Sequence, residues 1–134
     1  TLVVGYNTTF QRSSDLGRRM NQVFVGIPFG ILRRKLKYLC EMNGSRYVEQ
    51  EESYTSMASF WDLDEMPVYG EAGFVPPVFS GRRICRGLYQ DRSGRRINAD
   101  VNGALNIMRK CNIVSLRALY DRGDVDTPVR IRIA

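Results

Sequence analysis

The sequence predicts an α/β fold in which a parallel strand–helix–strand unit is followed by an irregular insert and a last amphipathic helix. Residues 1–6 form a short apolar run, and residues 45–50 form a second strand-like run. Between them, Pro28 is placed to start a helix and Gly44 is placed to end it. A helix that connects two such strands predicts a parallel pair, because the chain must cross over between them.

The segment NADVNGALNI, residues 98–107, predicts the start of a helix over residues 100–111. Asn98 is a good N-cap, and four apolar residues follow at helical spacing, namely Val101, Ala104, Leu105 and Met108. Asp100 and Gly103 lie together on the adjacent face, where a carboxylate could hold a divalent cation and a glycine permits a close approach. An Asp at a helix start also suits the helix dipole, so local chemistry leaves both interpretations open.

Between the second strand and this helix, residues 53–96 are rich in Pro and Gly and predict an irregular insert. Possible turns at Ser80-Gly81 and Ser93-Gly94 predict short strands within it. Residues 113–134 form a basic tail, and the alternation of residues 127–134 is typical of an edge strand.

The net charge of +6 is unevenly distributed. Residues 1–80 carry 8 basic and 9 acidic groups, whereas residues 81–134 carry 12 basic and 5 acidic groups. The arginines of the insert are Arg82, Arg83, Arg86, Arg92, Arg95 and Arg96, with Tyr89 among them. Guanidinium groups pair with phosphate oxygens and an aromatic ring can stack on a base, so the pattern favours nucleic-acid binding over a merely solvated basic surface.

The remaining composition predicts one soluble domain in a reducing compartment, with the cytoplasm as the expected location. The cysteines are three, odd in number and far apart, which argues against a disulfide framework. No apolar run is long enough to cross a membrane, and no signal peptide is visible, so no membrane partner is expected.

Five segments in order resemble one family: GYN, GRRMNQVFVGIPFG, EESYTSMASFWD, RGLY and NADVNGALNIMRK. They are similar to the C-terminal part of TnpB (OrfB) proteins of bacterial insertion sequences, which resemble Fanzor proteins and type V CRISPR nucleases. The resemblance implies an RNA-guided DNA endonuclease with a RuvC-like domain of the ribonuclease H fold, although many members are labelled transposases. The implied partners are target DNA, a guide RNA and an upstream N-terminal half of the same protein, in a prokaryotic cytoplasm near the nucleoid.

On this resemblance, residues 1–52 and 97–112 are expected to form the C-terminal half of the RuvC-like domain. Residues 53–96 are expected to form a degenerate zinc-ribbon-like insert, and residues 113–134 a basic tail. Ala58 and Trp61 stand where the first Cys pair of such a ribbon is expected, and only Cys85 lies near the second. Because structural zinc needs four Cys or His ligands, we expect no zinc site. A small apolar core of Phe60, Trp61, Phe74 and Phe79 is expected instead.

The resemblance also implies a site for Mg²⁺ or Mn²⁺, held by three acidic residues. Asp100 matches the third acidic motif of the family. The second acid usually ends the first strand, where Gly5 or a neighbour stands here, and Glu52 matches a substitute glutamate used by part of the family. Glu51 is the alternative, since adjacent strand residues face opposite ways. The first acid is expected upstream of residue 1, so this chain alone is expected to lack one ligand and not to cut DNA or fold stably.

Five further residues match the family and are expected to contact nucleic acid: Asn102, Asn106, Tyr54, Thr55 and Ser56. For the two asparagines, the alternatives are a place in the second shell of the metal or hydrogen bonds on the helix surface, and for the other three residues the alternative is a structural turn. The second candidate function is a nucleic-acid-binding remnant or an accessory, transposase-associated protein without cleavage activity.

Overall fold

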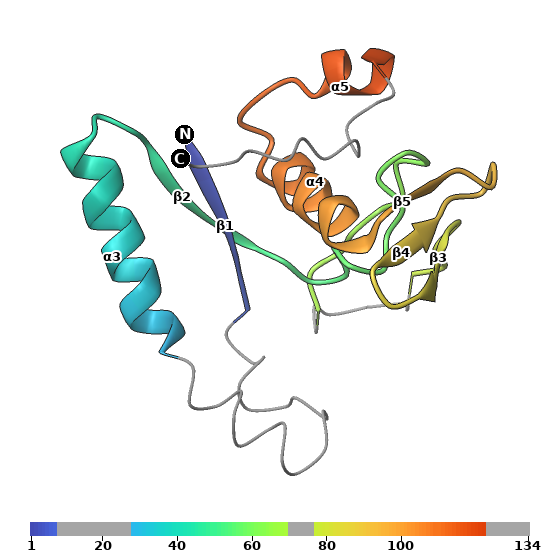
Figure 1. Ribbon diagram of the computed structural model, residues 1–134, viewed down its shortest axis with the longest axis horizontal. Coiled ribbons are helices and arrows are strands. Elements are labelled where there is room, and N and C mark those ends of the chain that lie inside the picture. Colours follow the sequence, from blue (N-terminus) through green and yellow to red (C-terminus); the bar gives the residue numbers. More distant parts are fainter. Residues whose placement is uncertain (8–27, 70–76, 123–134) are drawn as a thin grey trace, which may run out of the picture. The chain divides into compact units, whose positions relative to one another are not determined.

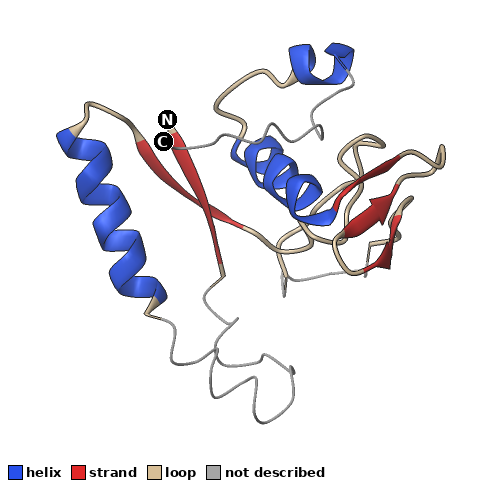
Figure 2. Ribbon diagram, viewed as in Figure 1, coloured by secondary structure: helices blue, strands red, loops and turns tan. Residues whose placement is uncertain are grey.

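The computed structural model describes residues 1–7, 28–69 and 77–122, which form two compact units. Unit 1 is Thr1–Glu52 and unit 2 is Ser53–Ala134. Figure 1 labels the elements of each unit along the chain, and Figure 2 distinguishes helices, strands and loops. The boundary follows the second strand, and the last amphipathic helix belongs to the same compact unit as the insert.

Unit 1 is the predicted strand–helix–strand unit. Strand β1 (Leu2–Tyr6) and strand β2 (Tyr47–Glu51) pair in parallel and are connected through helix α3 (Phe29–Met42). The Pro28 carbonyl accepts the first helical hydrogen bonds, and Gly44 follows the helix with a φ of +62°. Both sequence signals for the helix ends are therefore confirmed.

Helix α3 interacts with one face of the β1–β2 pair. Arg33 donates a hydrogen bond to Glu49 (3.3 Å), and its guanidinium lies 5.0 Å from the ring centre of Tyr6. Tyr6 is opposite Glu51 in the parallel register. Since side chains alternate along a strand and paired residues share a face, Glu49 and Glu51 lie on the α3 side, and Gln50 lies on the other side.

Unit 2 contains a three-stranded antiparallel sheet in the order β3-β4-β5, followed by two helices (Figure 1). The strands are β3 (Arg82–Cys85), β4 (Leu88–Gln90) and β5 (Arg96–Asn98), and the helices are α4 (Ala99–Cys111) and α5 (Arg117–Arg122). Positive φ angles at Gly87 and Gly94 mark the two turns between the strands. The turn at Gly94 is confirmed, whereas the turn at Gly87 and helix α5 were not predicted.

The core of unit 2 joins the insert, the sheet and both helices. Its buried members are Phe60, Tyr89, Ile97, Ala99, Leu105 and Leu116. Tyr120 of α5 stacks on Phe60 with ring centres 4.6 Å apart, and Trp61 packs edge-on against both rings. The aromatic core predicted for the insert is thus confirmed at Phe60 and Trp61. The third ring of this core is Tyr120 of α5, which lies far from Phe60 and Trp61 along the chain.

Phe79 and Ala104 were also predicted to belong to apolar clusters, Phe79 in the insert and Ala104 on α4. Phe79 packs against Tyr54, with ring centres 5.9 Å apart. Ala104 is exposed, so its expected place in the buried stripe of α4 is wrong. Phe74 and the predicted strand over residues 127–134 lie outside the described residues. None of the described helices has the length and apolar character that crossing a membrane requires.

Candidate metal and nucleic-acid site

Asp100 lies in the first turn of α4, with its side chain exposed. The cap is Asn98, whose Oδ1 accepts hydrogen bonds from the backbone N–H groups of Asp100 (2.9 Å) and Val101 (3.1 Å). The side chain of Asp100 is therefore not needed as the cap. A Cβ at Gly103 would meet no atom within 4 Å, so the space next to this glycine is open. An exposed carboxylate beside open space can accept a cation.

Glu52 directly follows β2, and its backbone N–H donates to the Tyr6 carbonyl (3.2 Å), which continues the parallel ladder by one residue. Strand alternation then places Glu52 on the face of Gln50 and Gly5, which is opposite to the α3 face that Glu51 occupies. Burial, and then the charge of Glu51, raises the pKa of Glu52 above its ordinary value. Such a carboxylate gains from a nearby positive charge, which favours its ionised form.

The two acidic residues belong to different units, Glu52 to unit 1 and Asp100 to unit 2. Their convergence on one ion stays a prediction. Within residues 1–7, 28–69 and 77–122, no three His, Cys, Asp or Glu side chains are grouped to hold a metal. The expectation that a third acid comes from outside this chain is likewise a prediction.

The side chains of Asn102 and Asn106 are fully buried and bind the loop of residues 55–60. Asn102 accepts a hydrogen bond from the Phe60 N–H (3.1 Å) and donates to the Ala58 carbonyl (2.9 Å). Asn106 donates to the carbonyls of Thr55 (2.9 Å) and Ala58 (2.8 Å). The expectation that these two amides contact nucleic acid is corrected, since they have no exposed surface and satisfy buried backbone groups.

Tyr54, Thr55 and Ser56, at the start of this loop region, differ in exposure. Thr55 is buried, Ser56 is exposed and Tyr54 is half-buried, with a φ of +64°. The Tyr54 ring contacts Phe79 and Tyr69, and burial raises the pKa of its hydroxyl. A direct contact of Thr55 with nucleic acid is therefore corrected to a structural role, whereas contacts of Tyr54 and Ser56 stay predictions.

The insert arginines lie on the surface of unit 2 and Tyr89 lies inside it. Arg82, Arg83, Arg86, Arg92, Arg95 and Arg96 are all exposed. Tyr89 is 1% exposed and its hydroxyl donates to the Met57 carbonyl (2.8 Å). Burial and three nearby Asp residues raise the pKa of Tyr89 to about 12, so the hydroxyl keeps its proton. The prediction that Tyr89 stacks on a base is wrong, because its ring belongs to the core.

The residues at the positions expected for zinc ligands differ in exposure. Ala58 is fully buried, and Cys85 is exposed on β3. Trp61 lies between the aromatic core and Arg95, whose guanidinium is 4.6 Å from the indole centre. Aromatic packing and a cation–π contact thus stabilise this part of the insert.

Comparison with protein families identifies the family of this chain. The model of the Cas12f1-like TNB domain matches residues 29–107, which is more than half of the chain. The chain belongs to the Cas12f1-like TNB family. No curated protein and no solved structure matches it.

Membership in the Cas12f1-like TNB family places the chain among TnpB/Cas12-type proteins, a nuclease-related family. It implies interaction with nucleic acid, both DNA and guide RNA. The matched residues run from α3 to the second buried amide of α4, and they include Glu52, Asp100 and the six insert arginines.

Sequence reasoning missed three side chains that connect the segments of unit 2. Arg109 donates to the Asp64 carbonyl, Lys110 donates to the Ser53 carbonyl (3.2 Å), and Tyr120 donates to the Phe60 carbonyl (3.2 Å). The four-residue spacing of Asn102 and Asn106 beside an apolar stripe could have shown that one polar face of α4 is buried. No comparable signal was present for Tyr120.

Proposed function

We propose that this chain is the C-terminal part of a TnpB-like, RNA-guided DNA endonuclease. The family match over residues 29–107 is the observation that carries the proposal. The parallel pair β1–β2 with its connecting helix is compatible with part of a RuvC-like domain of the ribonuclease H fold. The mobile-element context, the prokaryotic cytoplasm and the guide RNA are parts of the same proposal.

Asp100 and Glu52 are the proposed metal ligands, together with an acid from an upstream segment. When bound, Mg²⁺ or Mn²⁺ supplies activation of water and neutralisation of charge at the phosphate. The exposed carboxylate of Asp100 and the open space beside Gly103 support this role. For Glu52, the supporting observation is its place on the β-sheet face opposite α3. Glu51 shares the α3 face, which disfavours it as the ligand.

The test is magnesium-dependent cleavage by the complete protein with its guide RNA. Asp100→Asn and Glu52→Gln each remove one charged ligand and are expected to slow cleavage about 100-fold or more, since even changes around metal ligands cost 10- to 100-fold. Asp121→Asn, at another exposed helical carboxylate, and Glu51→Gln are the matched controls and are expected to cut like wild type. Full cleavage by Asp100→Asn or Glu52→Gln would remove that residue from the site.

The exposed insert arginines favour a second candidate function, a nucleic-acid-binding protein without cleavage activity. Each arginine–phosphate contact contributes about one unit to the slope of log affinity against log salt concentration. Arg83→Ala and Arg96→Ala are each expected to lower that slope by about one for the DNA duplex. If the complete wild-type protein binds target DNA with its guide and cuts nothing in magnesium, this second function replaces the first.

A further inference from the structure

A pocket of about 550 Å³ opens on unit 2 between two segments that are adjacent in space. One wall is residues 79–82, which lead into β3, and the other wall is residues 90–94, which form the turn between β4 and β5. The pocket is bounded entirely by residues of unit 2. Its volume lies within the range of pockets that hold small organic molecules.

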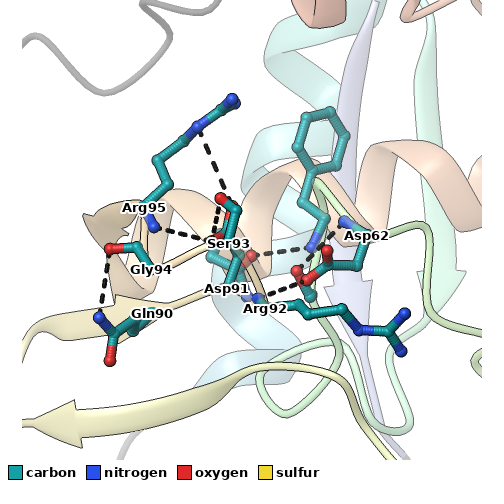
Figure 3. A network of polar contacts seen from close by, with 10 residues as sticks. Asp62, Gln90, Asp91, Arg92, Ser93, Gly94 and Arg95 are labelled. Atoms are coloured by element: carbon teal, nitrogen blue, oxygen red, sulfur yellow. Dashed lines mark hydrogen bonds and ion pairs between the residues drawn. The ribbon is translucent and has the colours of Figure 1, made fainter.

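A polar network fixes the turn that forms the second wall (Figure 3). The Asp91 carboxylate accepts hydrogen bonds from the Ser93 hydroxyl (2.8 Å) and the Arg95 N–H (2.8 Å), and Gln90 Nε2 donates to the Gly94 carbonyl (3.2 Å). The Arg92 N–H donates to Asp62 (3.0 Å). Because these bonds use backbone groups of the turn, the wall is shaped before any ligand arrives.

A second carboxylate, that of Asp64, holds the first wall in place. Asp64 accepts hydrogen bonds from both the backbone N–H (3.0 Å) and the hydroxyl (2.6 Å) of Ser80. Gly81 is required there, because a Cβ at this position would lie 2.6 Å from the Gln90 carbonyl oxygen and from the Tyr89 ring. The two walls are therefore in close contact at Gly81 and Gln90.

The lining groups combine three kinds of chemistry. Phe79 supplies an aromatic ring, and Gln90 supplies an amide that both donates and accepts hydrogen bonds. Arg82 and Arg92 line the pocket from its two walls, and both are exposed. Figure 3 shows Arg92 and Arg95 extending in different directions from the turn. Arg95 contacts Asp91 and Trp61, whereas Arg92 lines the pocket.

Three carboxylates near the pocket, those of Asp62, Asp64 and Asp91, are each bonded to protein donors. Asp91 pairs with Arg95, and Asp64 is bonded to Ser80 and to the Ser59 N–H. Burial alone would raise the pKa of Asp62, but the nearby Ser59 and Ser80 side chains, the hydrogen bond from the Arg92 N–H and the Arg92 charge lower it. These carboxylates are thus turned toward protein donors.

We propose that this pocket binds one unpaired nucleotide of a single-stranded nucleic acid, and the proposal rests on the proposed function of this chain in nucleic-acid binding. The base stacks on Phe79 and is bonded at its edge by the Gln90 amide, while Arg82 and Arg92 contact the flanking phosphates. A base within a duplex is stacked and paired and cannot enter, whereas an unpaired base can. DNA and RNA strands share this chemistry.

The test is fluorescence anisotropy of the full chain in metal-free buffer at one salt concentration. The probes are a labelled 12-residue oligothymidylate, a labelled 12-residue oligouridylate and a labelled 12-base-pair DNA duplex. The pocket variants are Arg92→Ala and Phe79→Leu. Arg83→Ala is the matched control, because this exposed arginine lies beside Arg82 in β3 and does not line the pocket.

We expect the wild-type chain to bind a single strand, and the tighter of the two strands identifies the sugar that the pocket accepts. Phe79→Leu weakens binding of that strand about tenfold, which corresponds to the loss of one stacked base. Arg92→Ala removes a phosphate contact and weakens it by a similar factor, and both variants weaken duplex binding less than twofold. Arg83→Ala weakens single strand and duplex by the same factor. Thermal unfolding monitored by circular dichroism shows which variants are folded. If Phe79→Leu is not folded, Arg92→Ala alone tests the inference.

Two results overturn the inference without touching the proposed function. In the first, the wild-type chain binds duplex and neither single strand. In the second, the folded pocket variants weaken single strand and duplex by the same factor, as Arg83→Ala does. If the wild-type chain binds none of the three probes, the proposed function in nucleic-acid binding fails together with the inference.

Discussion

The two units of this chain are built in different ways. Among the described residues of unit 1, Cys40 is the one buried apolar side chain, and α3 exposes five large ones, namely Ile31, Leu32, Tyr38, Leu39 and Met42. Unit 2 buries an aromatic core and two asparagines that bind backbone more than 40 residues away. Unit 1 is therefore defined by local pattern and strand pairing, whereas unit 2 is defined by long-range packing.

The largest effect is expected from the core of unit 2. Phe60→Ala removes a fully buried ring that stacks on Tyr120 and contacts Trp61. Truncating a buried Phe costs about 3–5 kcal/mol, because transfer energy is lost and a cavity remains. We expect urea denaturation monitored by tryptophan fluorescence to show that loss in the free energy of unfolding. A change below about 1 kcal/mol would mean that the aromatic core does not hold unit 2 together.

The buried amides of α4 are expected to rank next and to differ from each other. Asn102→Ala leaves the buried Phe60 N–H without its acceptor and is expected to cost about 1–3 kcal/mol. Asn106→Ala removes its bonds to the carbonyls of Thr55 and Ala58, of which Ala58 keeps Asn102 as a donor, and it eliminates a buried Oδ1 that has no partner in the described part of the chain. We therefore expect the smaller loss at Asn106, measured by the same urea denaturation, and an equal or larger loss there would contradict this comparison.

Unit 1 offers a pH-dependent test at its boundary with unit 2. Because the pKa of Glu52 is raised above the ordinary value of 4.5, the folded state holds this proton more tightly than the unfolded state. Stability contributed by this group is then full below pH 4.5 and falls as pH rises through the folded pKa. Glu52→Gln is expected to be more stable than wild type at pH 7, and this difference should disappear near pH 3.5. Thermal unfolding at both pH values measures it, with Glu49→Gln as the control.

The smallest effect is expected from the apolar side chains of α3. Leu39 is 50% exposed, so Leu39→Ala should change the free energy of unfolding by less than about 0.5 kcal/mol. This variant is the counterpart of Phe60→Ala, since both shorten a large apolar side chain. A loss of 2 kcal/mol or more at Leu39 would show that the face of α3 is covered and that the contrast between the units is false.

The sequence predicted the elements whose signals are local. An apolar run indicated β1, and a strand-like run indicated β2. Pro28 and Gly44 indicated the ends of α3, and Asn98 indicated the start of α4, because caps and strand patterns act over a few residues. The Gly94 turn was predicted for the same reason. Helix α5 has six residues and is held by packing of Tyr120, which local pattern does not specify.

The roles of polar and aromatic residues were harder to predict than the elements that carry them. Asn102, Asn106 and Tyr89 have the chemistry of nucleic-acid contacts, but all three are buried by residues 32–51 positions away along the chain. Burial depends on tertiary contacts, which residue type and spacing do not reveal. The exposure of Asp100 and of the insert arginines agrees with a role in binding. The pocket lined by Arg82 and Arg92 could not be predicted from the sequence, because its two walls are separate segments that only the fold brings together.

The central claim is that Glu52 and Asp100 share a metal ion, and anomalous X-ray diffraction of the complete protein soaked in Mn²⁺ tests it most directly. We expect an anomalous peak within about 2–2.5 Å of a carboxylate oxygen of each residue, as oxygen ligands require. A peak that touches other residues, or Glu52 and Asp100 carboxylates that lie more than about 8 Å apart, would contradict the shared site.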